Sequence, residues 1–189
     1  MMTVELYTAE NTPNQREIAE RLLHELIADE SAPEAVLAAA RTLTHVIVHN
    51  PPVWVSGTDE PRHLVRVTVP GSWNTQRFTE YLTPKITDIV GEAGAREEPR
   101  VVVQIVGLRE HSVGTMGRVT TSTDITRMMT VGHQVDHTQA PEGKALDPVC
   151  GMTVDLATAT LTLEYEGMTY AFCAPACRKV FAEDHAIPV

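Results

Sequence analysis

The chain has 189 residues, of which 43% are hydrophobic, so it can bury the core of one medium domain and a small second one. A formal net charge of -10 argues against sequence-independent binding to nucleic acid and against docking on anionic membranes, because both need clustered Lys and Arg. The opening MMTVELYTAENTP is not of signal-peptide type, and the apolar runs at 35–40 and 101–103 are too short to span a bilayer. We therefore expect a cytoplasmic protein.

Two stretches, 3–58 and 63–115, share one pattern. Each opens with an alternating or β-branched run and continues into a segment whose apolar residues recur every four positions, as in a helix with one apolar face. These positions correspond between the copies as Ile18 with Phe78, Leu22 with Leu82, and Leu26 with Ile86. A second apolar strand follows in each copy, at 43–48 and 101–106. The pattern predicts strand, helix, strand, twice over, as in a duplicated unit.

Candidate capping residues precede both predicted helices. Thr12 is followed by Pro13 and, three residues on, by Gln15, which is the pattern of a capping box with proline at the first helical position. Ser72 occupies the matching place in the second copy. Pro84 lies inside the second helical pattern, so we expect that helix to kink or to lose a hydrogen bond there.

The tandem strand-helix-strand units, with the glycine-bearing tail HSVGTMG at 111–117, resemble the tautomerase superfamily of 4-oxalocrotonate tautomerase and macrophage migration inhibitory factor (MIF) over residues 2–129. The resemblance implies an α+β fold with a mixed sheet and two helices on one face, assembled as a homotrimer. In that family an amino-terminal proline is the general base, whereas this sequence begins Met1-Met2-Thr3. We expect the fold without the reaction and assign no catalytic residue. The alternative is an enzyme acting on a small keto acid, with His111 as a candidate in its pocket.

Between 131 and 144 the chain turns polar and loses its periodicity, which is typical of a linker. An ordered surface loop is the alternative. With a linker there, the predicted organisation is a tautomerase-like domain at 1–130 and a small domain at 145–189.

All three cysteines, Cys150, Cys173 and Cys177, fall in this small domain. Cys150 precedes a glycine that lets the backbone fold round a bound ion. Cys173 and Cys177 are one helical turn apart, across the start of a short helix at Pro175, so their sulfurs can face one point. We expect the positive end of this helix to lower the pKa of both thiols, which favours the thiolates that a metal requires.

Three motifs follow one another here: DPVCGM at 147–152, YEGMTY at 165–170 with a hairpin turn at its centre, and FCAPAC at 172–177. Together they resemble the YHS (TRASH-like) metal-binding domain. The resemblance implies a small treble-clef-like fold of a β-hairpin and a short helix. It also implies Cys150, Cys173 and Cys177 as metal ligands.

Three sulfur ligands suit copper(I) or another heavy metal, whereas zinc favours a fourth ligand. The candidates for that ligand are His133, His137 and His185, and Met152 offers a thioether to copper. The alternatives to a metal site are that the cysteines are small buried hydrophobes, or that Cys173 and Cys177 form a disulfide. The function that we expect is sensing, buffering or delivery of a soft metal on an oligomeric platform. A role as accessory subunit of an oxygenase or of a metal-transport system is the other reading.

Overall fold

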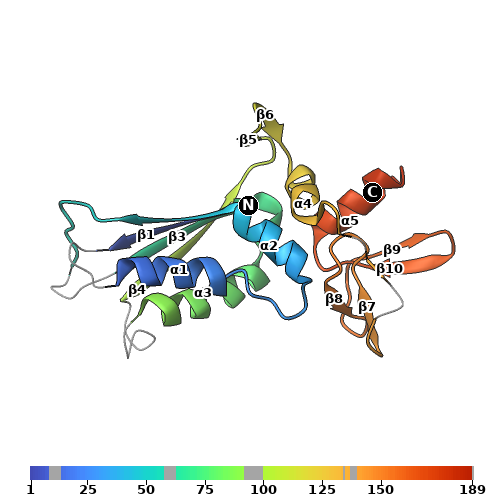
Figure 1. Ribbon diagram of the computed structural model, residues 1–189, viewed down its shortest axis with the longest axis horizontal. Coiled ribbons are helices and arrows are strands. Elements are labelled where there is room, and N and C mark those ends of the chain that lie inside the picture. The colour runs from blue at the N-terminus through green and yellow to red at the C-terminus, as the bar shows by residue number, and fades with distance from the viewer. Residues whose placement is uncertain (9–13, 58–62, 92–99, 134, 137–139, 189) are drawn as a thin grey trace. The chain divides into compact units, whose positions relative to one another are not determined.

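The computed structural model describes residues 1–8, 14–57, 63–91, 100–133, 135–136 and 140–188 (Figure 1). They form two compact units, one of Met1–Ala28 with Leu43–Arg109 and the other of Asp29–Thr42 with Glu110–Val189. The predicted domains at 1–130 and 145–189, with a linker between them, remain a prediction. Within the described ranges, no helix combines the length and the apolar character needed to cross a membrane.

The first unit contains a four-stranded mixed sheet in the order β2-β1-β3-β4. Its strands are β1 (Met2–Thr8), β2 (Thr44–His49), β3 (His63–Pro70) and β4 (Val101–Leu108). β1 is parallel to β2 and antiparallel to β3, and β3 is parallel to β4. Every second residue of β1 is buried, as are Val65, Val67 and Val69 of β3, because alternate side chains of a strand point to one face. The predicted α+β class with a mixed sheet is confirmed.

Helices α1 (Gln15–Glu25) and α3 (Gln76–Val90) lie on one face of this sheet (Figure 1). Leu22, Leu82 and Ile86, at the predicted apolar positions, are buried between helices and sheet. Complete burial of one such side chain stabilises the fold by about 1.5–3 kcal/mol. The side chains on the opposite face of the sheet are not covered by these two helices.

The structure describes the start of α1 from Asn14 onward, and there it differs from the sequence prediction. Thr12 and Pro13, the predicted cap and first helical residue, lie outside the described residues. The helix begins at Gln15, and the residue before it, Asn14, has a φ of 58° and no side-chain capping hydrogen bond. Asparagine tolerates this left-handed conformation better than most residues.

The prediction of Ser72 as the cap of the second helix is wrong. The chain leaves β3 through a short 3-10 turn, η1 (Gly71–Trp73), which includes Ser72. The extended backbone that a cap requires is found at Thr75, whose hydroxyl accepts a hydrogen bond of 3.2 Å from the amide of Phe78. The helix then continues through Pro84 to its end.

The second unit holds helices α2 (Glu34–Thr42), α4 (Ser122–Thr130) and α5 (Pro175–Asp184). Only α5 is predicted by the sequence patterns. A signal for α4 was present, because Thr121 and Asp124 form a capping box, with each side chain accepting from the other residue's amide. Before it, β5 (Val113–Thr115) and β6 (Arg118–Thr120) form a hairpin in and after the glycine-bearing tail.

Two further hairpins complete this unit, β7 (Lys144–Leu146) with β8 (Thr153–Asp155) and β9 (Thr162–Tyr165) with β10 (Met168–Ala171). The predicted turn between β9 and β10 is confirmed: Glu166 and Gly167 have φ of 51° and 78°. A hydrophobic cluster joins β9, the end of β10 and α5, and it includes Cys150 and Cys177 beside Phe172 and Phe181.

Candidate metal centre

Cys150 lies in a tight backbone knuckle between β7 and β8. The amide of Asp147 donates to the Met152 carbonyl at 2.9 Å, and the amide of Gly151 donates back to the Asp147 carbonyl at 2.8 Å. Gly151 has a φ of 71°, a conformation that costs a residue with a Cβ about 1–2 kcal/mol. The closed knuckle places the Cys150 side chain in the hydrophobic cluster.

The other two cysteines lie where β10 passes into α5. Pro175 occupies the first turn of α5, as predicted, and Cys177 is buried in that same turn, while Cys173 is half-buried. The Sγ atoms of Cys150 and Cys173 are 3.5 Å apart, and those of Cys173 and Cys177 are 3.8 Å apart. All three cysteines are free thiols, so Cys173 and Cys177 do not form a disulfide.

The spacing of these sulfurs fits a metal ion. Zinc-to-sulfur bonds of about 2.3 Å in a tetrahedral site separate two sulfurs by about 3.8 Å. Each cysteine, together with Asp147, offers one donor atom to a group whose members all lie within 4.8 Å of one another. Asp147 is part of the DPVCGM motif, but its presence among the donor atoms was not predicted.

Asp147 is fully buried and joins the two halves of the centre. Its Oδ1 accepts from the amides of Val149 at 2.9 Å and Cys150 at 3.3 Å. Its Oδ2 accepts from the amide of Cys173 at 2.8 Å. Burial, followed by the charge of Cys150, raises the pKa of Asp147 to about 6. The carboxylate thus holds the knuckle and the start of α5 in one arrangement.

The three thiols titrate differently from the prediction. Hydrogen bonds from the thiols of Cys173 and then Cys177 lower the pKa of Cys150 to about 4. The pKa values of Cys173 and Cys177 are raised, chiefly because each donates its S–H to Cys150. The expected lowering by the helix end is therefore wrong for the metal-free thiols. The contacts with Cys173 and Cys177 therefore favour the thiolate form at Cys150 over the other two thiols.

None of the described histidines belongs to the group of donor atoms. The His133 ring packs against Gly151, and its Nε2 atom is buried. His185 is exposed, with its ring centroid 4.3 Å from that of Phe181. His137 lies outside the described residues. Met152 packs against the hydrophobic cluster. His111, the pocket candidate of the glycine-bearing tail, is exposed with a φ of 65°.

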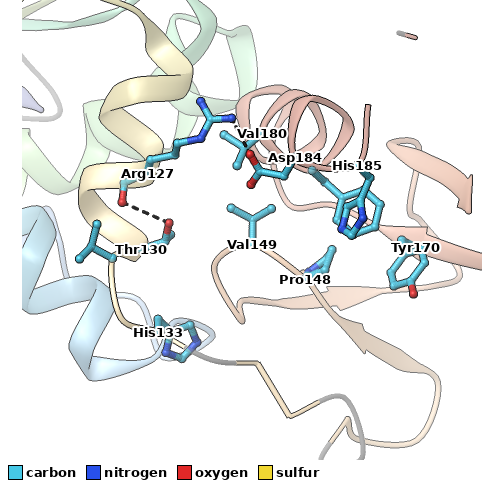
Figure 2. Close-up of a pocket in the computed structure, with 11 residues that line it drawn as sticks. Arg127, Thr130, His133, Pro148, Val149, Tyr170, Val180, Asp184 and His185 are labelled. Carbon is cyan, nitrogen blue, oxygen red and sulfur yellow. Dashed lines mark hydrogen bonds and ion pairs between the residues drawn. The ribbon is translucent and has the colours of Figure 1, made fainter. Parts of the chain in front are cut away.

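A pocket of about 550 Å³ is lined in part by Pro148 and Val149, which directly precede Cys150. Figure 2 shows residues from α4, from the loop at Pro148 and Val149, and from α5 around it. Arg127 of α4 pairs there with Asp184 of α5, with Nη2 and Oδ1 2.8 Å apart. The pocket and the thiols therefore share the same loop and the same helix.

Gly151→Ala is expected to lower the free energy of unfolding more than Gly167→Ala does. Both glycines have a positive φ, so both substitutions carry backbone strain of about 1–2 kcal/mol. At Gly167 a Cβ meets nothing within 4 Å, whereas at Gly151 it meets His133 Nε2 at 2.5 Å and Pro33 Cγ at 3.0 Å. Denaturant titration of both variants measures the difference. Equal losses would contradict the close packing of the knuckle.

Residues 145–186 match the family model of the YHS domain, and this segment of the chain is a YHS domain. The recognition of this domain from its three motifs is thus confirmed. A comparison with curated proteins finds no match.

Solved structures similar to this chain are proteins of the tautomerase and MIF type. Pt0534 inactivated by 2-oxo-3-pentynoate is 16% identical, with 62% of this chain and 95% of that chain covered and a TM-score of 0.47. A MIF homologue from Prochlorococcus marinus is 14% identical, with 62% and 97% covered and a TM-score of 0.46. N1, a member of the cis-3-chloroacrylic acid dehalogenase family, is 17% identical, with 62% and 82% covered and a TM-score of 0.44.

Proposed function

We propose that the chain binds one soft metal ion through the thiolates of Cys150, Cys173 and Cys177. The convergence of three sulfurs, with spacings of 3.5 and 3.8 Å, is the observation that carries this proposal. Copper(I) suits a three-sulfur site, and zinc suits the same sulfurs with a fourth ligand. Asp147 supports the site by fixing the backbone of Cys150 and Cys173.

We propose that this binding is reversible and serves sensing, buffering or delivery of the metal. Cys150 and Cys177 are buried in the hydrophobic cluster, which shields the ion from water. Such a site requires reduced thiols, in keeping with the predicted location in the cytoplasm.

Titration of the full, reduced chain with buffered copper(I) tests the proposal. We expect saturation at one ion per chain and sulfur-to-metal charge transfer in the ultraviolet. Iodoacetamide should label the thiols of the metal-free chain faster than those of the loaded chain. Labelling that is the same with and without the ion would contradict the proposal.

We also propose that the first unit assembles as a homotrimer through the uncovered face of its sheet. Ile47 of β2 and Val102 and Val106 of β4 lie on this face and are 38–43% exposed. They alternate with residues that face α1 and α3, so the two helices of their own unit do not cover them. Apolar side chains on an open sheet face are typical of surfaces that pair with other copies.

The variant Ile47→Lys/Val102→Lys is expected to shift the trimer toward monomer. Two added charges on the open face would be desolvated without partners in an assembly. Multi-angle light scattering should give three times the chain mass of 20.7 kDa for the natural chain and about one chain mass for the variant. Val55→Lys is the control, because Val55 is 89% exposed and lies outside the sheet. A natural chain of monomer mass would overturn the trimer.

A further inference from the structure

Three thiolates leave a four-coordinate ion one ligand short, and Asp147 is poorly suited to supply it. Both of its oxygens already accept backbone hydrogen bonds from the knuckle or from Cys173. A shift of this carboxylate toward an ion would pull on the loops that place two of the three sulfurs. Its contacts are those of a positioning residue, so a further side chain near the centre could supply the missing ligand.

His133 carries an unexplained buried nitrogen next to the knuckle. Nε2 has no hydrogen-bond partner in the described part of the chain, although the atom is buried. It lies 2.5 Å from the place that a Cβ would take on Gly151, the residue after Cys150. Buried polar atoms are nearly always satisfied, and an ion that is not present in the coordinates is one established reason for an exception. Imidazole nitrogen is also a common zinc ligand.

The fold anchors His133 to the helix that carries Cys177. The amide of His133 donates to the carbonyl of Thr130 at 3.0 Å, directly after α4. Arg127 fixes α4 to α5, with its Nη2 2.9 Å from Glu183 Oε2 and 2.8 Å from Asp184 Oδ1. The histidine therefore follows a helix that is paired with the last turn of α5, the helix whose first turn holds Cys177.

We propose that His133 Nε2 becomes the fourth ligand when a tetrahedral ion such as zinc binds the three thiolates. This inference rests on the thiolate site proposed above. Nε2 lies outside the group of donor atoms within 4.8 Å, so binding requires the ring to move toward the sulfurs. The turn that carries it has a glycine, Gly132, with a φ of 75°, and the movement would have to come from this turn and from rotation of the side chain. His133 precedes the YHS segment of 145–186, so the completed site would tie metal binding to α4.

Cadmium-113 bound to the full chain, labelled with 15N-histidine, tests this assignment. We expect one cadmium signal in the range of thiolate ligation and a one-bond coupling to a single imidazole nitrogen. In His133→Ala the coupling should be lost, and cadmium should bind at least about tenfold more weakly. His185→Ala is the matched control. His185 lines the same pocket as His133, but its ring packs on Phe181 and Tyr165. That variant should keep the coupling.

The outcomes separate the two proposals. A thiolate-ligated cadmium signal without nitrogen coupling in the natural chain would overturn the role of His133 and leave the thiolate site intact. A coupling that persists in His133→Ala would also overturn it. Failure of the natural chain to bind any cadmium would overturn the thiolate site, and the role of His133 with it.

Discussion

Replacing Cys173 and Cys177 together with serine is expected to weaken copper(I) binding by at least about a thousandfold. The affinities of structural zinc sites, about 10–16 kcal/mol, are shared among four ligands, so the loss of two ligands removes roughly half of such an energy. A serine hydroxyl is nearly as small as the thiol, but it is a hard donor that stays protonated at neutral pH. Competition with a chromophoric copper(I) chelator measures the change.

Met152→Leu is the control for this prediction. Met152 brings a fourth sulfur close to the knuckle, and it packs against the hydrophobic cluster. Leucine preserves that packing and removes the thioether. We expect unchanged copper(I) affinity for this variant. A double serine variant that binds as tightly as the natural chain would show that the thiols are not the ligands.

Asp147→Ala is expected to lower the free energy of unfolding of the metal-free second unit by on the order of 3 kcal/mol or more. The substitution removes the acceptor of three backbone amides, those of Val149, Cys150 and Cys173, in a fully buried position. Each buried donor left without a partner costs about 1–3 kcal/mol. Hydrogen exchange at these three amides reports the loss locally, and denaturant titration reports it globally.

Asp155→Ala is the matched control, since Asp155 also accepts an amide hydrogen bond, from Ala157 at 2.9 Å. That contact is exposed, so water can replace it and the expected loss is below about 1 kcal/mol. Equal effects of the two substitutions would contradict the role of Asp147 in joining the two halves of the centre. The same comparison in the presence of metal shows how much of the loss an ion restores.

Short-range patterns account for the parts of the structure that could be predicted. The alternation of Val65, Val67 and Val69 is a property of consecutive residues, and it reports burial on one face of a strand. The hairpin at Glu166 and Gly167 likewise depends on two neighbours with positive φ. In the metal centre the separation of Cys173 and Cys177 by one turn is local, and the structure brings their sulfurs together.

The features that were not predicted depend on contacts between distant segments. Asp147 accepts from Cys173, 26 residues away, and nothing in the local sequence of either residue encodes that pairing. The raised pKa values of Cys173 and Cys177 arise from their contact with Cys150, which outweighs the end of a short helix. Helix α2 escaped prediction because its alanine-rich sequence has only Val36 as a buried position.

The metal content of the full chain, purified under reducing conditions and measured by elemental analysis, is the most direct test of the thiolate site. We predict about one copper or other soft metal ion per chain, retained on gel filtration. When the ion is removed and the three thiols are then alkylated, the chain should no longer bind the metal. A chain that stays free of metal after exposure to excess copper(I) and to zinc, with all its thiols reactive, would contradict the account.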